Sequence, residues 1–264
     1  MTLIVSLRIP DGIVIAGDSL STLMGQGQFE TTIGVTCPAC NHQHEIQPKS
    51  PLFPVPGTTF SYAQKVFPFC EKFGVGTFGS GLLANKSVYF IMRLFQGKLE
   101  MAPSEGVTKV TEKIGGRIHN LLKEQLKREN IALDTVPDDQ VLLGFQIVGY
   151  DGIEPKTVEV LIGKNVHTQV IDQLGCTVSG SREVVEAIWG LYAKHPQSQP
   201  PYEVFSLQDA IDYAEFLIRT TIEHQRFSQT IPNVGGDIDI ALVTPFDGFR
   251  WIRQKPLGKV LEGK

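Results

Sequence analysis

The pattern of apolar and polar residues predicts a β-hairpin at the start of the chain. Residues 2–8 alternate apolar and polar side chains and are rich in β-branched residues, and residues 13–17 form a second short apolar run. The sequence Pro10-Asp11-Gly12 between these runs is typical of a tight turn. We therefore expect residues 2–17 to form a hairpin, which would tie the N-terminal strand into a sheet.

Four later segments carry the three-and-four spacing of apolar residues that predicts a helix. Each also has end signals, such as a serine before the first turn and a glycine or proline after the last. The predicted helices cover residues 80–95, with a start at Ser80 or Gly81, residues 104–130, residues 181–195, and the segment that begins after Ser206.

Short apolar runs separated by turn residues predict the remaining strands. They cover residues 73–78, 141–150, 157–163, 167–171, 176–179, 237–244 and 249–253. Apart from the strand at residues 73–78, the predicted order is two strands, two helices, four strands, two helices and two strands, and two antiparallel sheets between two helical layers would bury every apolar face. We predict an α+β fold, a four-layer αββα sandwich.

Composition narrows the function classes. The 264 residues are 42 % hydrophobic with a formal net charge of −4, which is an ordinary globular mixture. Basic residues form no run, so we expect no nucleic-acid partner. No apolar run reaches the ~18–20 residues of a membrane helix, so we expect no membrane partner. The start lacks the features of a signal peptide, and four cysteines do not make a disulfide framework. These features favour the cytoplasm.

Residues 20–62 differ from the rest of the chain. They contain a Cys37/Cys40 pair, two histidines and four prolines, and they are too many for a simple connection. We expect residues 1–264 to form a single domain with an inserted lobe at about residues 23–62.

The Cys37-Pro38-Ala39-Cys40 turn within this lobe has the usual shape of a zinc knuckle. His42 and His44 follow closely and would complete four zinc ligands. The alternative is a pair of thiols in a polar loop. A thioredoxin-like redox role is disfavoured because no βαβ pattern surrounds the pair.

Thr2 is the first candidate for catalysis. Methionine is normally removed before a small residue, and removal of Met1 would leave Thr2 with a free α-amine. The threonine hydroxyl can then attack a carbonyl while its own amine, whose ordinary pKa is about 7.7–8.0, accepts the proton. Threonine after methionine is common, so this reading needs support from elsewhere in the chain.

That support comes from the sequence T-L-I-V-S-L-R-I-P-D-G-I-V-I-A-G-D-S-L-S-T at residues 2–22. It closely resembles the mature N-terminus of proteasome β subunits and of the related bacterial ATP-dependent peptidase. The resemblance implies that Thr2 is the nucleophile and that Asp18 is a buried aspartate at the family's separation. It also aligns Thr22 with a threonine whose backbone pairs with the bound peptide.

Later segments extend the resemblance. Lys65-Val66 matches the family's lysine, which is followed by a strand and a glycine-rich turn at residues 79–81. The resemblance makes the amide of Ser80 or Gly81 the oxyanion donor, with Gly81 favoured and Ser80 placed beside the substrate. Ser179 matches a serine near the nucleophile, and residues 235–244 resemble a late family strand. Two features differ from the family's pattern: the aspartate expected before Gly235-Gly236 is absent, and Val234 replaces an expected serine.

The resemblance implies an N-terminal nucleophile (Ntn) hydrolase fold and a threonine-type endopeptidase that needs no cofactor for catalysis. It also implies a peptide or unfolded-protein substrate, self-association into a ring or stacked rings, and an ATPase or α-type partner. Three alternatives remain open: a non-catalytic ring or scaffold subunit, an Ntn amidase acting on small amides, and a zinc-dependent partner-binding lobe formed by the insert.

Overall fold

The computed structural model describes residues 2–27, 33–36, 40, 43–46, 53–98, 105–229 and 231–256. The chain divides into two compact units. The larger contains Met1–Ser21 together with Phe60–Lys264, and the smaller is Thr22–Thr59.

The first sheet of the larger unit is built on the N-terminal hairpin. Its strand order is β14-β1-β2-β15-β16, and all neighbours are antiparallel. The hairpin predicted for residues 2–17 is confirmed, with Leu7 opposite Val14. The strands are β1 (Leu3–Ile9), β2 (Gly12–Asp18), β14 (Gly175–Gly180), β15 (Ile238–Thr244) and β16 (Gly248–Arg253).

The second sheet has the order β13-β12-β11-β8-β7, again antiparallel throughout. Its strands are β7 (Val66–Phe69), β8 (Phe73–Gly79), β11 (Leu143–Asp151), β12 (Glu154–Ile162) and β13 (Val166–Ile171). The mixed helix and strand content with antiparallel sheets agrees with the predicted α+β class.

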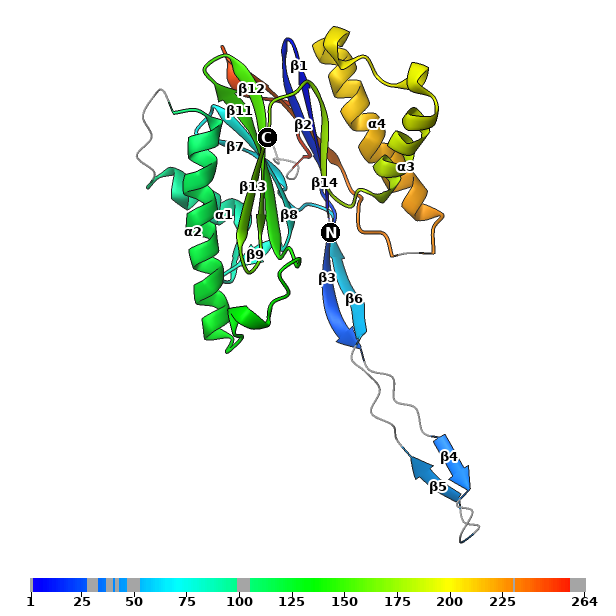
Figure 1. The fold of residues 1–264 in the computed structure, drawn as a ribbon. Coiled ribbons are helices and arrows are strands. Elements are labelled where there is room, and N and C mark those ends of the chain that lie inside the picture. Colours follow the sequence, from blue (N-terminus) through cyan, green and yellow to red (C-terminus); the bar gives the residue numbers. More distant parts are fainter. Residues whose placement is uncertain are drawn as a thin grey trace, which may run out of the picture. The chain divides into compact units, whose positions relative to one another are not determined.

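Three hydrophobic clusters hold together the helices and sheets whose arrangement Figure 1 shows. One joins α1 and α2 to the second sheet, and another joins α3 and α4 to the first sheet. The third lies between the sheets and includes Ile4, Ile15, Val66 and Val148. The helices are α1 (Val88–Gln96), α2 (Val107–Arg128), α3 (Glu183–Lys194) and α4 (Leu207–Arg226), with short 3₁₀ turns η1 (Leu133–Thr135), η2 (Pro196–Ser198) and η3 (Tyr202–Val204).

The predicted start of the first helix is wrong. The chain after Gly81 forms a small hairpin, β9 (Leu82–Leu83) with β10 (Lys86–Ser87), before α1 begins at Val88. Ser87 is the cap, because its side chain accepts a hydrogen bond from the amide of Phe90. The turn residues Ala84 and Asn85 both have positive φ. Glycine usually marks this conformation in a sequence, and neither position is a glycine.

The other helix ends follow the sequence more closely. The predicted cap Ser206 and its partner Asp209 form a reciprocal capping box at the start of α4. Helix α2 begins at Val107 after Gly106. The predicted cap Ser104 lies outside the described residues.

The smaller unit consists of paired strands. β3 (Ser21–Gly27) pairs with β6 (Phe53–Phe60), and β4 (Ile33–Thr36) pairs antiparallel with β5 (Gln43–Ile46).

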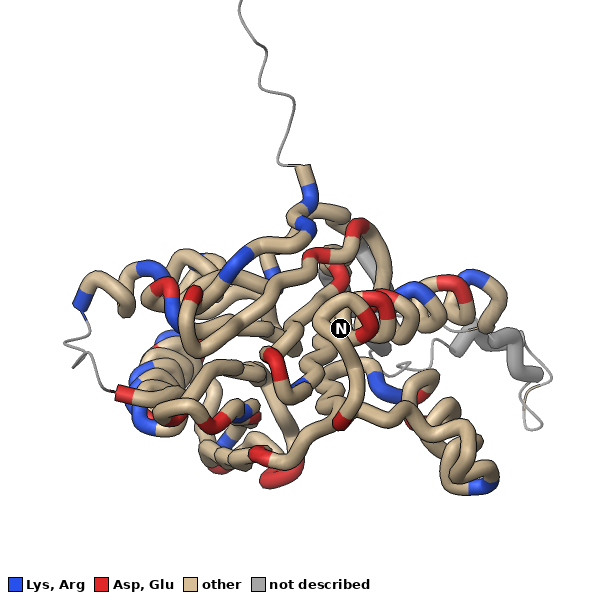
Figure 2. Tube along the Cα trace, turned by 90° about the horizontal axis from the view of Figure 1, so that it is seen from above, with Lys and Arg blue, Asp and Glu red and all other residues tan. Residues whose placement is uncertain are grey.

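Charge is mixed along the described backbone: Lys and Arg alternate with Asp and Glu rather than gathering on one side (Figure 2). Within the part of the chain that the structure describes, no helix is both long and apolar enough to cross a membrane.

Candidate active site at the N-terminal strand

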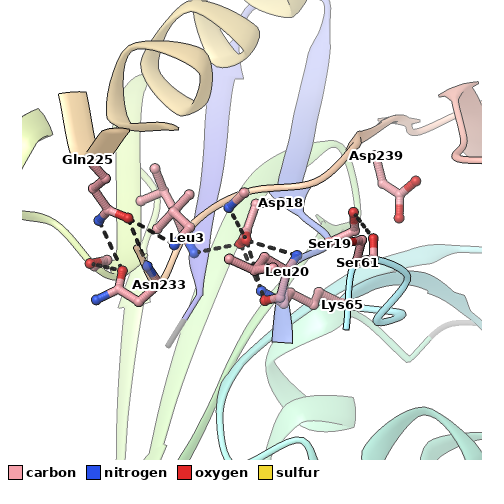
Figure 3. Close-up of polar contacts among 12 residues, drawn as sticks. Leu3, Asp18, Ser19, Leu20, Ser61, Lys65, Gln225, Asn233 and Asp239 are labelled. Carbon is pink, nitrogen blue, oxygen red and sulfur yellow. Dashed lines mark hydrogen bonds and ion pairs between the residues drawn. The ribbon is translucent and has the colours of Figure 1, made fainter. Parts of the chain in front are cut away.

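Asp18 is the centre of a buried polar cluster at the end of β2 (Figure 3). Its side chain is fully buried. Oδ1 accepts the amide of Leu3 at 2.9 Å, and Oδ2 accepts the amides of Leu20 at 3.2 Å and Gly235 at 3.0 Å. Such charge-assisted bonds are stronger than neutral ones, so the carboxylate ties three chain segments together.

Lys65 pairs with this carboxylate. The lysine immediately precedes β7, and its Nζ lies 2.9 Å from Oδ1 and 3.0 Å from Oδ2 of Asp18. Nζ also donates to the carbonyl of Leu20. The backbone of Lys65 is fixed in turn, because its carbonyl accepts the amide of Thr77 at 2.9 Å.

Burial governs the titration of this pair. Lys65 is 5 % exposed, and burial lowers the pKa of its ammonium, while the charge of Asp18 offsets part of that change. Burial likewise raises the pKa of the Asp18 carboxyl against the opposing effect of Lys65. Removing either partner would leave a poorly solvated charge, so the two groups depend on each other.

Thr2 is linked to this pair through the backbone of the next residue, Leu3. It is 4 % exposed, and the amide that follows it, that of Leu3, shares the Oδ1 oxygen of Asp18 with Lys65. Side chains of a strand alternate between its two faces. Leu3 and Val5 pack toward the helices and Ile4 toward the other sheet. Thr2 therefore belongs to the face between the sheets.

Gly180 holds the other side of Thr2. The amide of Ser181 donates to the carbonyl of Thr2 at 2.8 Å, and Gly180 lies opposite Leu3 in the β1-β14 pair. Gly180 has φ +90°, and a Cβ added there would lie 1.8 Å from the Thr2 carbonyl oxygen. Only glycine permits this approach.

We expect Gly180→Ala to lower the free energy of unfolding by at least about 1 kcal/mol, because positive φ and the clash both oppose the added methyl group. Urea denaturation measures this change. Gly116→Ala is the matched control: Gly116 is helical and open, so alanine should stabilise the protein by about 0.5–1 kcal/mol. Equal stability of the two variants would show that β14 does not constrain Thr2 as described.

The glycine-rich turn after β8 contains both predicted oxyanion donors, Ser80 and Gly81. Gly79 has φ +82°, and a Cβ there would lie 2.7 Å from the carbonyl oxygen of Leu142. The amide of Ser80 already donates to that oxygen at 2.9 Å. Among the described residues, a Cβ added to Gly81 would meet nothing within 4 Å. Of the two oxyanion donors considered from the sequence, Gly81 is therefore the one whose surroundings are open.

Ser179 has two partners that the sequence did not indicate. Its hydroxyl accepts from Nε2 of Gln146 at 2.6 Å and donates to the carboxylate of Glu159. Both partners come from the second sheet, so this contact crosses between the sheets. Nothing in their local sequence distinguishes Gln146 or Glu159, because only the pairing of distant strands brings them to Ser179.

The segment before Gly235-Gly236, where Val234 replaces the serine of the family's pattern, is held by a side chain of α4. Val234 is 1 % exposed and packs in the helix-side cluster of the first sheet. The amides of Asn233 and Val234 donate to Oε1 of Gln225 on α4, at 2.9 and 3.0 Å. Asn233 also accepts the hydroxyl of Ser181. Gln225 thus fixes the loop that delivers the Gly235 amide to Asp18.

The remaining candidates lie in the smaller unit. Thr22 is part of β3, and its role toward a substrate stays a prediction. Cys37 and His42 fall outside the described residues, Cys40 is an exposed turn residue, and His44 is placed in β5 by its backbone. The side chains that the structure describes contain no group of three or more potential metal ligands. The zinc site stays a prediction.

Comparisons with solved structures show which known proteins have a similar fold. No protein-family model matches the sequence, and no curated protein matches it. The chain resembles the solved Anbu (Gly-1) mutant from Hyphomicrobium sp. strain MC1 with a TM-score of 0.52 and 12 % identity, over 97 % of this chain and 86 % of that one. It resembles Anbu (ancestral beta-subunit) from Yersinia bercovieri with a TM-score of 0.50 and 13 % identity, over 95 % and 86 %.

These matches correct the assignment made from the sequence. The family assigned there, proteasome β subunits with the bacterial ATP-dependent peptidase, is wrong, because the structural neighbours are Anbu proteins, a proteasome-like group. The motifs around Thr2, Asp18 and Lys65 describe the geometry of an N-terminal strand and its ion pair, and different families on one fold can share such a feature. At these identities the likeness concerns the fold: this chain is similar in fold to Anbu proteins.

Proposed function

We propose that the protein is an N-terminal threonine hydrolase that cleaves peptide bonds, with Thr2 as its nucleophile after removal of Met1. One observation carries this proposal. The buried Asp18 carboxylate joins the ammonium of Lys65 to the backbone that immediately follows Thr2. Burying an ion pair at a chain start gives little stability by itself, so a chemical role explains it better.

The proposed reaction begins at the hydroxyl of Thr2. Oγ1 attacks the carbonyl carbon of the scissile peptide while its proton passes to the α-amine of the same residue. The carbonyl oxygen becomes an oxyanion, which the amide of Gly81 would stabilise, a contribution typically worth a few kcal/mol. The C–N bond then breaks, and the departing amine takes the proton from the α-ammonium.

Water completes the cycle. The first half leaves an ester between Thr2 Oγ1 and the acyl part of the substrate. The α-amine, now neutral again, takes a proton from a water molecule, whose oxygen attacks the ester carbonyl. Collapse of this second tetrahedral intermediate returns a proton to Oγ1 and releases the acid product.

Lys65 would act by its charge. A cation beside Thr2 favours the alkoxide that develops during attack, and it lowers the affinity of the nearby amine for a proton. Asp18 keeps that cation in place through two hydrogen bonds. The amine is then neutral, and able to act as the base, at a lower pH than an isolated α-amine.

The wider features belong to the same proposal. The fold is a four-layer αββα sandwich of the Ntn-hydrolase type, with helical layers outside both sheets. A peptide would add as a strand beside Thr22. Self-association into a ring is proposed from the likeness to Anbu, whose name includes "beta-subunit". We place the protein in the cytoplasm.

Covalent labelling tests the function. We expect mass spectrometry of the freshly purified protein to show a chain that begins at Thr2. A peptide β-lactone should then add its mass to the N-terminal peptide with one-to-one stoichiometry, and peptide hydrolysis should fall in parallel. An intact Met1 together with an unlabelled N-terminus would contradict the hydrolase and favour the scaffold. Labelling with hydrolysis of small amides alone would favour the amidase.

A further inference from the structure

A carboxylate and an amide from the second sheet reach the first sheet beside Thr2. Gln146 on β11 and Glu159 on β12 lie directly opposite each other. Both contact the hydroxyl of Ser179, at 2.6 Å for Nε2 of Gln146 and through a very short bond to Glu159. Gln146 is fully buried and Glu159 is half-buried. The three side chains form a polar bridge between the two sheets, in addition to the contacts of Ser6 and Arg8 with Thr157.

Strand register places this bridge next to the nucleophile. Ser179 lies opposite Ile4 on β1, and Ile4 packs between the sheets. Thr2 is two residues before Ile4, so Thr2 and Ser179 are diagonal neighbours on the same face of the sheet. Diagonal neighbours lie about 7–8 Å apart, so one water can bridge their polar groups.

The polar bridge of Gln146, Ser179 and Glu159 has more hydrogen-bond acceptors than donors. Oε1 of Gln146 is buried and has no hydrogen-bond partner among the described residues. Ser179 has already given its single proton to Glu159. A buried acceptor without a donor costs about 1–3 kcal/mol, so the arrangement favours a donor at this position. An ammonium group, with three donors and one positive charge, has the complementary chemistry.

We propose that Glu159, acting through Ser179 and Gln146, is the positioning carboxylate for the α-amine of Thr2. The inference rests on the proposed function, since it assigns how that function's base is held. It also accounts for Val234, whose buried apolar side chain can offer the amine no polar group. Ser179 Oγ and the buried Oε1 of Gln146 would accept hydrogen bonds from the amine, while the charge of Glu159, bonded to Ser179, favours the ammonium and helps to orient the neutral amine toward Oγ1.

Other charged groups face the same region. Arg8 on β1 donates to Thr157, two residues before Glu159, and to Thr177. His167 on β13 pairs with Leu161, two residues after Glu159. The ion pair Lys65–Asp18 lies at the end of β2, and the ion pair Lys255–Asp239 joins β15 to the segment after β16. Because several ionisable groups surround the bridge, the pH dependence of activity alone would not isolate the amine, and the amine must be titrated directly.

The test compares Glu159→Gln with Glu154→Gln. Glu154 begins the same strand and is exposed, so it is a matched control for the loss of one negative charge. Each full-length protein is treated with methionine aminopeptidase so that it begins at Thr2. The amine is titrated by competitive acetylation with mass spectrometry of the N-terminal peptide, and hydrolysis is followed over the same pH range.

In Glu159→Gln we expect the midpoint of amine acetylation to fall by roughly half a pH unit or more, since a negative charge that favours the ammonium is lost. The acidic limb of hydrolysis should shift by the same amount. Because Glu159 acts on the base and not on the substrate, kcat should fall about tenfold while KM is unchanged. Glu154→Gln should match the wild type in all three measurements.

Equal acetylation midpoints in Glu159→Gln and the wild type would overturn the inference even if the wild type hydrolyses peptides. If the wild type does not hydrolyse peptides, the proposed function fails, and the acetylation midpoint still decides the role of Glu159. The relay is tested in a Ser179→Ala background. There the Glu159→Gln shift should shrink, and a shift of full size would overturn the route through Ser179.

Discussion

Thr2→Ala is expected to abolish peptide hydrolysis, with a loss of at least about 10³-fold. The substitution removes the only atom that the proposed reaction uses to form a covalent bond, and loss of a nucleophile removes the whole catalytic unit. Alanine is small, so removal of Met1 proceeds as before and the α-amine remains. Steady-state hydrolysis of a fluorogenic peptide measures the loss, and β-lactone labelling should disappear with it.

Thr2→Ser is the matched control for this experiment. Serine keeps the hydroxyl and the chain start while it removes one methyl group, so both hydrolysis and labelling should persist. Thr2 is 4 % exposed, and unfolding midpoints should be compared to show that each variant is folded. Wild-type hydrolysis by folded Thr2→Ala would contradict the assignment and locate the activity elsewhere.

Lys65→Met is the substitution with the second largest expected effect. It should reduce both peptide hydrolysis and the free energy of unfolding. The substitution leaves the Asp18 carboxylate buried without its cation, which typically costs about 3–5 kcal/mol of unfolding free energy. Hydrolysis should fall by at least about 10³-fold, because the charge beside Thr2 is gone. Urea denaturation and peptide hydrolysis, measured on the same preparation, give the two values.

A second variant separates the two consequences of this change. Lys65→Met combined with Asp18→Asn removes both charges, so part of the lost stability should return while hydrolysis stays low. Arg226→Met, which breaks an exposed ion pair with Glu223, should change stability by no more than about 0.5 kcal/mol. Full hydrolysis by the stable double variant would show that the ion pair is structural only.

Local sequence signals were enough to predict most of the secondary structure. The N-terminal hairpin and the capping box of α4 depend on neighbouring residues and were predicted from them. The start of α1 was not, because Ser80 and Gly81 resemble a helix start while Ser87 supplies the real cap. The hairpin between them needs positive φ at Ala84 and Asn85, which alanine in particular does not signal.

The site residues that belong to local sequence motifs were predictable. The contacts between residues of the two different sheets were not. The resemblance singled out Asp18 and Lys65 separately, and the structure shows that their side chains form an ion pair. The contact of Ser179 with Gln146 and Glu159 depends on the register of two separate sheets, which no local pattern specifies. The family itself was misassigned because short motifs around a site describe its chemistry better than its descent.

The single carboxylate of Asp18 receives hydrogen bonds from Leu3, Leu20, Lys65 and Gly235, which span almost the whole length of the chain. A half-made protein still lacks the last of these donors, and a partly opened one loses several at once. Whatever reactivity the chain start possesses should therefore arise in the closing step of folding. Under the proposed function, nascent or partly opened copies would therefore lack peptidase activity.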